Sequence, residues 1–397
     1  MCTKPGKGPV VQTVVPEAVV GVTKRLLALL VFSLSSLGAT AAVLPADRAD
    51  AMYHSYSGDG VSIDGPSILL RKKAGNNWSF SANYYVDTIS GASIDVRATA
   101  SPYKEERTET TVGVDYVRNK TSMAVSYTNS SENDFEANSL YFGVSQDFFG
   151  DLTTLSMSYS RGEDDVGRRG DASFAEEASR QKLGVGLTQV LTKNLIVGVN
   201  AENVSDEGYL NNPYRVIRYV DADSARGFSF MTEVYPQTRV SNAFSVNANY
   251  YLPYRASLYS DMRYYTDTWG IDAANAKFGY IHTFGDDWIL DFHVRYYQQD
   301  QADFYQDLFS RPDEFNYMAR DKELSTYQSF STGFKVTYEW QFSSQTIVEK
   351  SSVNLEYDYM KFDYDNFRDV TDDAPVGEEA LFGFSANVIR LYLSVWY

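Results

Sequence analysis

The residues best suited to chemistry lie in "WILDFHVRYY" (288–297), where Asp291, His293 and Arg295 occupy alternate positions. Alternate positions of a β-strand share one face, so these three side chains would stand in a row. A carboxylate beside a histidine can orient the ring as a general base. The sequence offers no nucleophile to pair with that base, and rows of charge commonly form salt bridges or a solvated lining. We therefore predict that the chain is not an enzyme and keep catalysis as the least favoured alternative.

The sequence contains few residues of the types that usually bind a metal or a cofactor. The chain has three histidines (His54, His282 and His293) and a single cysteine, Cys2. Haem, zinc and iron–sulfur sites draw on several such ligands, so we predict no cofactor and no metal site. The acidic segments "GEDDVG" (162–167) and "DVTDDAP" (369–375) could hold Ca²⁺ or bridge lipopolysaccharide through divalent ions. They do not follow the calcium-loop pattern, which favours solvated acidic loops.

The N-terminal region is typical of a secretory signal. Lys24 and Arg25 precede the apolar run "LLALLVFSLSSLGATAA", which ends in small residues. We predict a signal peptide at 1–42, with a gene start that could be over-extended, and one mature domain at 43–397. An uncleaved anchor is the alternative, but the apolar run is shorter than the roughly 20 residues that a spanning helix needs.

The mature chain would be acidic and rich in tyrosine. The whole sequence carries 35 basic and 52 acidic residues, and processing removes four of the former and one of the latter. The resulting net charge, about −20, disfavours nucleic acid as a partner. The 31 tyrosines combine an apolar ring with a polar tip, which suits boundaries between lipid and water.

After residue 42 the hydrophobic pattern has a period of two almost everywhere. Segments such as "TLSMSY", "GFKVTYEW" and "SVNLEYDY" alternate apolar with polar residues, which predicts strands that have one apolar and one polar face. Many of these strands end in Trp, Tyr or Phe, as the aromatic girdles of membrane barrels do. A soluble β-sandwich is the alternative, but strands of about 9–13 residues match the length that crosses a bilayer at a tilt.

The connections also alternate between short and long, the pattern of periplasmic turns and outer loops. Short links fall at 74–77, 119–121, 149–152, 192–194, 253–254 and 285–287, and a less regular one at 341–348. Long links fall at about 90–106, 131–137, 163–177, 205–238, 268–272, 300–324 and 364–379. With "ADAMYHSYS" (49–57) as the first strand and "GDG" as its turn, we predict a transmembrane antiparallel up-and-down barrel of about sixteen strands. Fourteen strands is the fallback if the first pair lies outside the wall.

The C-terminal segment "LYLSVWY" is predicted to be the strand that closes this barrel against 49–57. Leu391, Leu393, Val395 and Tyr397 share its apolar face. Bacterial outer-membrane barrels typically end in an alternating strand with a terminal aromatic residue. By that resemblance, these residues form the signal that the barrel-assembly machinery recognises.

Barrels of this size commonly enclose an aqueous lumen, and alternation predicts which side chains line it. The lumen-lining candidates are Asp261, Arg263, Asp291, His293, Arg295, Lys335, Glu339, Glu356, Asp358 and Arg390. Between about 122 and 198 the same face instead carries small residues, mostly Ser, Ala and Gly. The longest loop, 205–238, follows these small residues and carries Arg215, Arg218 and Arg226. We predict that it folds into the lumen as a constriction that faces the acidic wall; an external solvated loop is the alternative.

Nine stretches of the chain resemble one family of Gram-negative barrel proteins, the domain of unknown function 3570 family (DUF3570). They are "NYYVDTISGASIDV" (83–96), "TASPYKEERTE" (99–109), "SQDFFGDLTT" (145–154), "LTKNL" (191–195), "LNNPYR" (210–215), "YLPYRA" (251–256), "YYTDTWGIDA" (264–273), "ADFYQDLF" (302–309) and "ARDKELST" (319–326). The resemblance implies an outer-membrane barrel and supplies no activity. Members are often encoded beside a small lipoprotein, a thioredoxin-like protein and a flavin-transferring enzyme, which associates the family with extracytoplasmic redox partners.

Taken together, these patterns predict a porin-like protein of the Gram-negative outer membrane, in contact with lipid and lipopolysaccharide. We expect a channel or transport conduit for a small polar solute. The alternative is a scaffold barrel that presents a lipoprotein or periplasmic redox partner.

Overall fold

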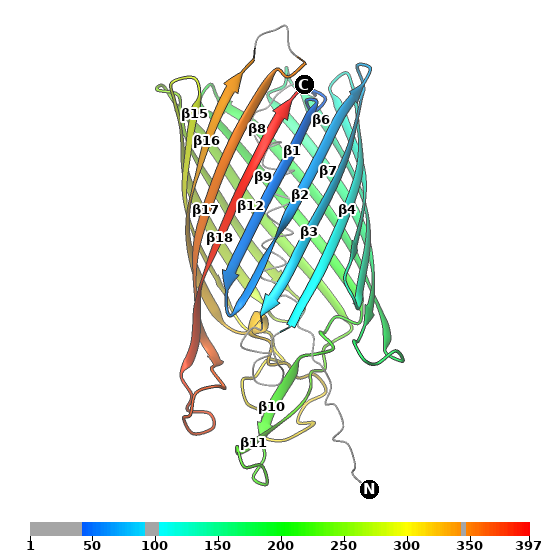
Figure 1. Ribbon diagram of the computed structural model, residues 1–397, viewed down its shortest axis with the longest axis vertical. Coiled ribbons are helices and arrows are strands. Elements are labelled where there is room, and N and C mark those ends of the chain that lie inside the picture. Colours follow the sequence, from blue (N-terminus) through cyan, green and yellow to red (C-terminus); the bar gives the residue numbers. More distant parts are fainter. Residues whose placement is uncertain (1–41, 92–102, 343–346) are drawn as a thin grey trace.

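The computed structural model describes residues 42–91, 103–342 and 347–397. Over these residues the chain forms a closed, antiparallel barrel of sixteen strands, together with a separate two-stranded hairpin (Figure 1). The wall strands are β1 Arg48–Gly58, β2 Val61–Ala74, β3 Trp78–Gly91, β4 Tyr103–Arg118, β5 Thr121–Ser131, β6 Phe135–Phe148, β7 Thr153–Gly167, β8 Ala175–Thr192, β9 Leu195–Gly208, β12 Thr238–Leu252, β13 Ala256–Asp267, β14 Asp272–Phe284, β15 Trp288–Gln299, β16 Tyr327–Gln341, β17 Lys350–Arg368 and β18 Leu381–Trp396. The hairpin consists of β10 Val216–Val220 and β11 Phe228–Thr232, and the short 3-10 helix η1 spans Lys322–Leu324.

The barrel closes where the sequence predicts. β18 pairs with β1 from Arg48↔Trp396 to Gly58↔Ala386, so the first pair of strands belongs to the wall and the count is sixteen. Asp59 and Gly60 form the β1–β2 turn with φ values of 49° and 71°. Two successive positive φ values are the signature of a type I′ turn, which suits the twist of a tight hairpin.

The outer face of the wall is apolar and is bounded by aromatic residues. Along β15, Leu290 and Phe292 are exposed to the outside while His293 is buried on the inside. At the short-turn end, the Trp78 ring lies 4.5 Å from Tyr116 and the Trp288 ring 4.7 Å from Tyr338. These rings belong to the exposed surface and form part of the aromatic girdle expected at a membrane interface. Among the described residues no helix is long and apolar enough to cross a membrane.

Several strands are longer than the sequence predicts. β17 has 19 residues and β8 has 18, against the 9–13 expected from the alternating segments. A bilayer crossing uses only about 9–11 of them, so the wall continues past the membrane on the long-loop side. For this reason "GEDDVG" is not a loop but the end of β7, and the predicted 163–177 loop shrinks to 168–174.

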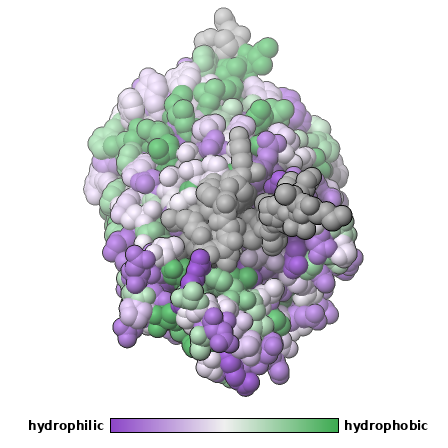
Figure 2. All heavy atoms as spheres, turned by 60° about the horizontal axis from the view of Figure 1, so that its bottom comes forward, coloured by the Kyte–Doolittle hydropathy of each residue, from purple (hydrophilic) through white to green (hydrophobic). Residues whose placement is uncertain are grey.

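The long-loop end carries a folded structure, which we call the cap: residues 209–237, 300–326 and 369–380. It includes β10, β11 and η1, and Figure 1 shows the β10–β11 hairpin beyond the end of the wall. Hydrophilic side chains gather around this end of the molecule (Figure 2). The predicted 205–238 loop is therefore a hairpin with short connections. The predicted signal peptide, residues 1–42, lies outside the described part of the chain except for its last residue.

Candidate functional site

The inner face of the wall carries the ten predicted lumen-lining residues. Each alternates along its strand with an outward apolar neighbour, for example Asp261 and Arg263 with the exposed Met262 on β13. Their contacts run around the inside of the barrel, from one strand to the next. The charged side chains of the inner face are thus held in place by contacts with neighbouring side chains.

Ion pairs connect strands across this face. Glu202 on β9 lies between Lys182 (2.5 Å) and Arg263 (2.7 Å). Glu339 on β16 pairs with Lys350 on β17 at 2.9 Å. Lys335 lies over the Tyr392 ring, 5.2 Å from its centroid. Glu202 and Glu339 are thus each matched by a cation on a neighbouring strand.

The predicted row Asp291, His293 and Arg295 does not act as a unit. Asp291 accepts a hydrogen bond from Tyr259 (2.9 Å) on one side, and Arg295 stacks over Tyr297. His293 instead lies 3.0 Å from Asp358 on β17. Asp291 and His293 thus pair with residues of other strands, whereas Arg295 contacts Tyr297 along its own strand.

His293 and Asp358 meet because a glycine separates them. Gly333 on β16 is paired with His293 on one side and with Asp358 on the other. A Cβ at Gly333 would collide with Asp358 Oδ1 and lie 2.7 Å from His293 Cε1. The glycine therefore opens the path between two strands that are not neighbours. Arg390 on β18 completes the group through Nη1, at 3.3 Å from Asp358 and 2.6 Å from Glu356.

A second group repeats this plan on β1–β4. His54 is paired with Gly65 of β2, and its Nε2 lies 2.7 Å from Oδ1 of Asp87 on β3. Arg107 on β4, paired with Asp87, donates to the other carboxylate oxygen. The Tyr85 ring stacks on His54 at 4.9 Å, and all four polar side chains are buried. No local sequence motif marks His54, because only the strand register aligns residues so distant along the chain.

The wall from β5 to β9 is built differently. A Cβ at Gly184 would lie 2.5 Å from Ser158 Oγ, and one at Gly186 would lie 2.6 Å from Asn200 Oδ1. Ser122 and Ser145 hydrogen-bond to each other at 2.6 Å. Small residues here lie beside hydroxyl and amide groups, so neutral hydrogen-bonding groups stand beside a few ion pairs such as Lys182–Glu202.

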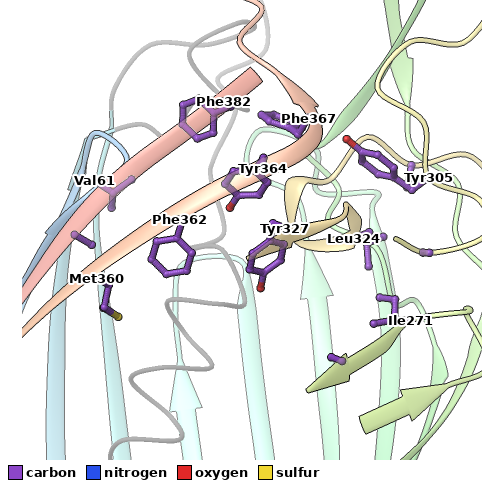
Figure 3. Close-up of a cluster of buried hydrophobic side chains, with 14 of the residues drawn as sticks. Val61, Ile271, Tyr305, Leu324, Tyr327, Met360, Phe362, Tyr364, Phe367 and Phe382 are labelled. Atoms are coloured by element: carbon purple, nitrogen blue, oxygen red, sulfur yellow. The ribbon is translucent and has the colours of Figure 1, made fainter. Parts of the chain in front are cut away.

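The cap closes over the inner face at the long-loop end through a buried apolar cluster. Tyr305 and Leu324, from the β15–β16 connection, pack with Tyr327, Tyr364 and Phe367 of the wall (Figure 3). The cluster's wall residues come from β1–β3, β14 and β16–β18. Its described members include none from β5–β9. The alternating pattern that revealed the strands gives no sign of this cluster, since "ADFYQDLF" and "ARDKELST" have no regular period.

The β10–β11 hairpin rests on the β15–β16 connection. Val220 N–H donates to Phe309 (2.9 Å) and Phe309 N–H donates to Arg218 (3.0 Å) through their main-chain carbonyls. Ile217, Phe309 and Met318 form a small buried core between them. Lys322, fully buried, lies 3.2 Å from Asp59 and so connects η1 to the β1–β2 turn.

The arginines predicted to form a constriction contact the cap and not the acidic wall. Arg218 is fully buried and pairs with Asp307 and Glu379, each at 2.5 Å, while Arg215 pairs with Asp321. Arg226 is exposed at the hairpin tip. The prediction that this loop faces the acidic wall is therefore wrong, because Arg215 and Arg218 pair with carboxylates of the neighbouring connections instead.

Burial and ion pairing shift the pKa values of Arg218 and Glu379 in opposite directions. Burial alone would lower the pKa of Arg218, but the hydrogen bond with Glu379 and the attraction of Asp307 outweigh it and raise that pKa. Burial alone would likewise raise the pKa of Glu379, and the hydrogen bond from Arg218 lowers it. Both groups are therefore held in their charged forms.

The C-terminal residue is attached to the opposite end of the barrel. Tyr397 donates its hydroxyl to the Arg71 carbonyl (3.2 Å), and Lys72 lies over its ring at 4.6 Å. Leu391 and Leu393 are exposed on the outer face of β18, while Val395 is half-buried near its end. Within the described ranges no group of three or more His, Cys, Asp or Glu side chains is arranged to hold a metal ion.

A family model described as "Protein of unknown function (DUF3570)" matches residues 93–182 and 171–368. The chain belongs to the DUF3570 family. No curated protein matches the sequence.

Similar solved structures are outer-membrane barrels. A structure named "Bacterial polysaccharide outer membrane secretin" is 9% identical with a TM-score of 0.51, covering 89% of this chain and 100% of that one. The outer membrane protein opdK from Pseudomonas aeruginosa is 9% identical with a TM-score of 0.41, covering 88% and 99%. At such identity the first of these shows a shared fold, and the chain has the fold of an outer-membrane β-barrel.

Proposed function

We propose that this DUF3570 protein is a gated channel of the Gram-negative outer membrane that passes small polar solutes. The observation that carries the proposal is the wall: a closed sixteen-strand barrel, apolar outside and lined with ion pairs inside. Barrels of 16–18 strands typically enclose an aqueous passage. A charged and hydroxyl-rich inner face would let hydrated solutes pass with little loss of hydrogen bonding.

The cap is the gate in this proposal. Its apolar cluster binds the strands that also carry the buried histidine groups. Its links to the β5–β6 and β7–β8 connections are mostly polar: Tyr214 donates to Asp134 and accepts from Arg169 N–H at 2.6 Å, beside one aromatic contact between Tyr209 and Phe174. Polar contacts exchange readily with water, so the cap would open first over the β5–β9 half and stay attached to the other half.

The fold shared with a structure that is named a polysaccharide secretin is consistent with a conduit for polar molecules. The buried carboxylate–histidine pairs of the wall have arginine or tyrosine neighbours, which suits a structural role rather than an enzyme. Lipid and lipopolysaccharide would surround the apolar outer face.

Liposome swelling tests the channel. Liposomes containing the refolded protein should swell in isotonic arabinose or glycine several times faster than protein-free liposomes. A trisaccharide should enter more slowly. If heat-modifiable, correctly folded barrels gave swelling no faster than protein-free liposomes, the channel proposal would be abandoned.

A scaffold role is the second candidate, and one surface favours it. Phe149, Leu152 and Leu191 are exposed around the β6–β7 and β8–β9 turns, where Val190 N–H bonds the Leu152 carbonyl at 2.8 Å. A periplasmic or lipoprotein partner could pack on these side chains. Purification under mild detergent would then return a lipoprotein in fixed ratio, and Phe149→Ser would release it. Its absence from purified protein would leave the scaffold without support.

We propose that Tyr397 is a signal for the barrel-assembly machinery. Deletion of Tyr397 should reduce the amount of folded barrel in the outer membrane severalfold. Tyr397→Phe separates recognition from the seam contact, because it keeps the aromatic terminus and loses only the hydroxyl bond to Arg71. Normal assembly after deletion would contradict this role.

A further inference from the structure

The cap meets the rim of the barrel beside three carboxyl groups. Glu105 lies on the inner face of β4, and Glu132 and Asp134 lie in the β5–β6 connection. Glu105 is only 4% exposed, and it accepts hydrogen bonds from the main chain and the side chain of Asn133, which lies between the other two along the chain. A buried carboxyl group is thus held against the connection that carries two more.

These groups lie beyond the membrane, at the level of the cap. The part of β4 that pairs with β5, residues 108–118, already supplies the roughly 9–11 residues that cross a bilayer. Glu106, the outward neighbour of Glu105, is exposed. Glu105 therefore belongs to the part of the wall that extends past the bilayer.

Of the described wall residues, two carboxylates and an arginine face Glu105. The charges of Glu132 and Asp134 repel its carboxylate. Arg107, the next inward residue of β4, lies 4.0 Å from Glu132 but donates to Asp87. Burial and the two repulsions raise the pKa of Glu105 to about 7, although the hydrogen bonds that it accepts act to lower it.

The cap contacts this cluster through Tyr214. The Tyr214 hydroxyl donates to Asp134 and accepts from the main-chain N–H of Arg169, in the β7–β8 connection, at 2.6 Å. Arg169 also attracts the Asp134 carboxylate through its charge. Burial, and after it the hydrogen bond to Asp134 and the charges of Asp134 and Glu105, raise the pKa of Tyr214. Glu105 is therefore close enough to influence the contact that holds this side of the cap.

We propose that Glu105, Glu132 and Asp134 form a proton-controlled latch between the wall and the cap. When Glu105 carries a proton, the cluster keeps the contact between Tyr214 and Asp134 closed. When it loses the proton, repulsion among three neighbouring carboxylates moves the connection away from the cap and admits water. The latch rests on the proposed function, in which the cap is a gate that opens first on this side.

The sign of the pH effect follows from the two states of the cap. The closed cap holds the pKa of Glu105 at about 7, and opening returns the group to water, where its pKa falls toward 4.5. Closing therefore takes up a proton, so the latch stabilises the closed cap fully below pH 4.5 and loses this contribution as the pH rises through 7. If opening restores the ordinary pKa, the ratio of open to closed channels rises about 30-fold between roughly pH 5.5 and pH 8.

Open probability in planar bilayers, recorded with protein purified from outer membranes, tests the latch. The wild type should show the rise of about 30-fold over this range. Glu105→Gln is a neutral mimic of the protonated residue, so its open probability should stay low and change less than about twofold. Glu106→Gln is the matched control: it removes an exposed carboxylate from the next position of the same strand and should keep the full rise.

Hydrogen–deuterium exchange gives a readout that does not need a conducting channel. After correction for the intrinsic pH dependence of exchange, the amides of 132–134 and 210–215 should exchange faster at the higher pH in the wild type and in Glu106→Gln, and not in Glu105→Gln. Asp134→Asn is a second variant, used if Glu105→Gln does not fold. It keeps an acceptor for Tyr214 and removes one repelling charge, so the transition should move to lower pH.

A wild type that does not respond to pH in either measurement would overturn the latch. An equal rise in the wild type and in Glu105→Gln would overturn it too, because another group would then be titrating. Exchange that follows the expected pattern without any change in conductance would support the latch and contradict the gate. A conducting protein that shows neither response contradicts the latch alone.

Discussion

The inside of this barrel has two unlike halves. From β15 through the seam to β4, buried histidine–aspartate–arginine groups join strands two apart, across Gly333 and Gly65. From β5 to β9 the wall carries Ser, Gly and Asn side chains and more exposed ion pairs such as Lys182–Glu202. The apolar cluster of the cap attaches to the first half. The difference indicates two structural roles: one half carries buried ion pairs and holds the cap, and the other carries smaller side chains, most of them neutral.

The strongest test of this contrast removes one arginine from each half. Arg107→Met leaves Asp87 buried without its cation and should lower the free energy of unfolding by about 3 kcal/mol. Arg180→Met, in a more exposed pair with Asp206 on β8 and β9, should change it by less than about 1 kcal/mol. Both values come from denaturant unfolding in detergent, followed by tryptophan fluorescence. Similar losses in the two variants would contradict the division.

A substitution at Gly333 tests the same contrast, because it adds a methyl group where the glycine now lets His293 and Asp358 meet. Gly333→Ala places a methyl group against Asp358 Oδ1 and separates that residue from His293, which should cost about 2 kcal/mol of unfolding free energy. Gly184→Ala is the matched control, because its new methyl meets only Ser158, whose hydroxyl can rotate away. The control should cost under about 1 kcal/mol. If Gly333→Ala were as stable as this control, the His293–Asp358 contact would contribute little.

A smaller effect is expected from acid, acting on the cap. The pKa of Glu379 is lowered in the folded protein, so its ion pair with Arg218 stabilises the cap above the unfolded pKa, near 4.5. That contribution is lost as the pH falls below 4.5 and through the folded pKa. Proteolysis of the cap by pepsin should therefore accelerate over this range, while the wall stays intact.

Glu379→Gln provides the control for the acid effect. The variant cannot lose a charge at this position, so its cap should be cleaved faster at neutral pH by a protease active there and should depend less on pH. A wild-type cap whose cleavage did not change between about pH 6 and pH 3, after correction for protease activity, would contradict the assigned pair.

The sequence is sufficient to predict the strands of the wall and their apolar faces. It is insufficient to predict the cap and the contacts between side chains inside the barrel. Alternation predicts that Leu290 and Phe292 face lipid and that 49–57 pairs with the last strand, because each strand has one apolar and one polar face. The cap could not be predicted, because Tyr305 and Leu324 lie in segments without a periodic hydrophobic pattern. The His54 group could not be predicted either, because only the strand register aligns its residues, which are His54, Gly65, Asp87 and Arg107. The role of Arg218 was mistaken because its partners, Asp307 and Glu379, lie in other connections.

The central claim is that a folded cap restricts a polar channel, and single-channel conductance tests it most directly. Gln299 and Tyr327 are paired in the wall, so residues 300–326 can be replaced by an Asn-Gly turn without moving β15 or β16. We expect short, rare openings for the wild type and a stable conductance severalfold larger in the mean for the replaced protein. A correctly folded, heat-modifiable variant with the same conductance as the wild type, or with none above the lipid background, would contradict it.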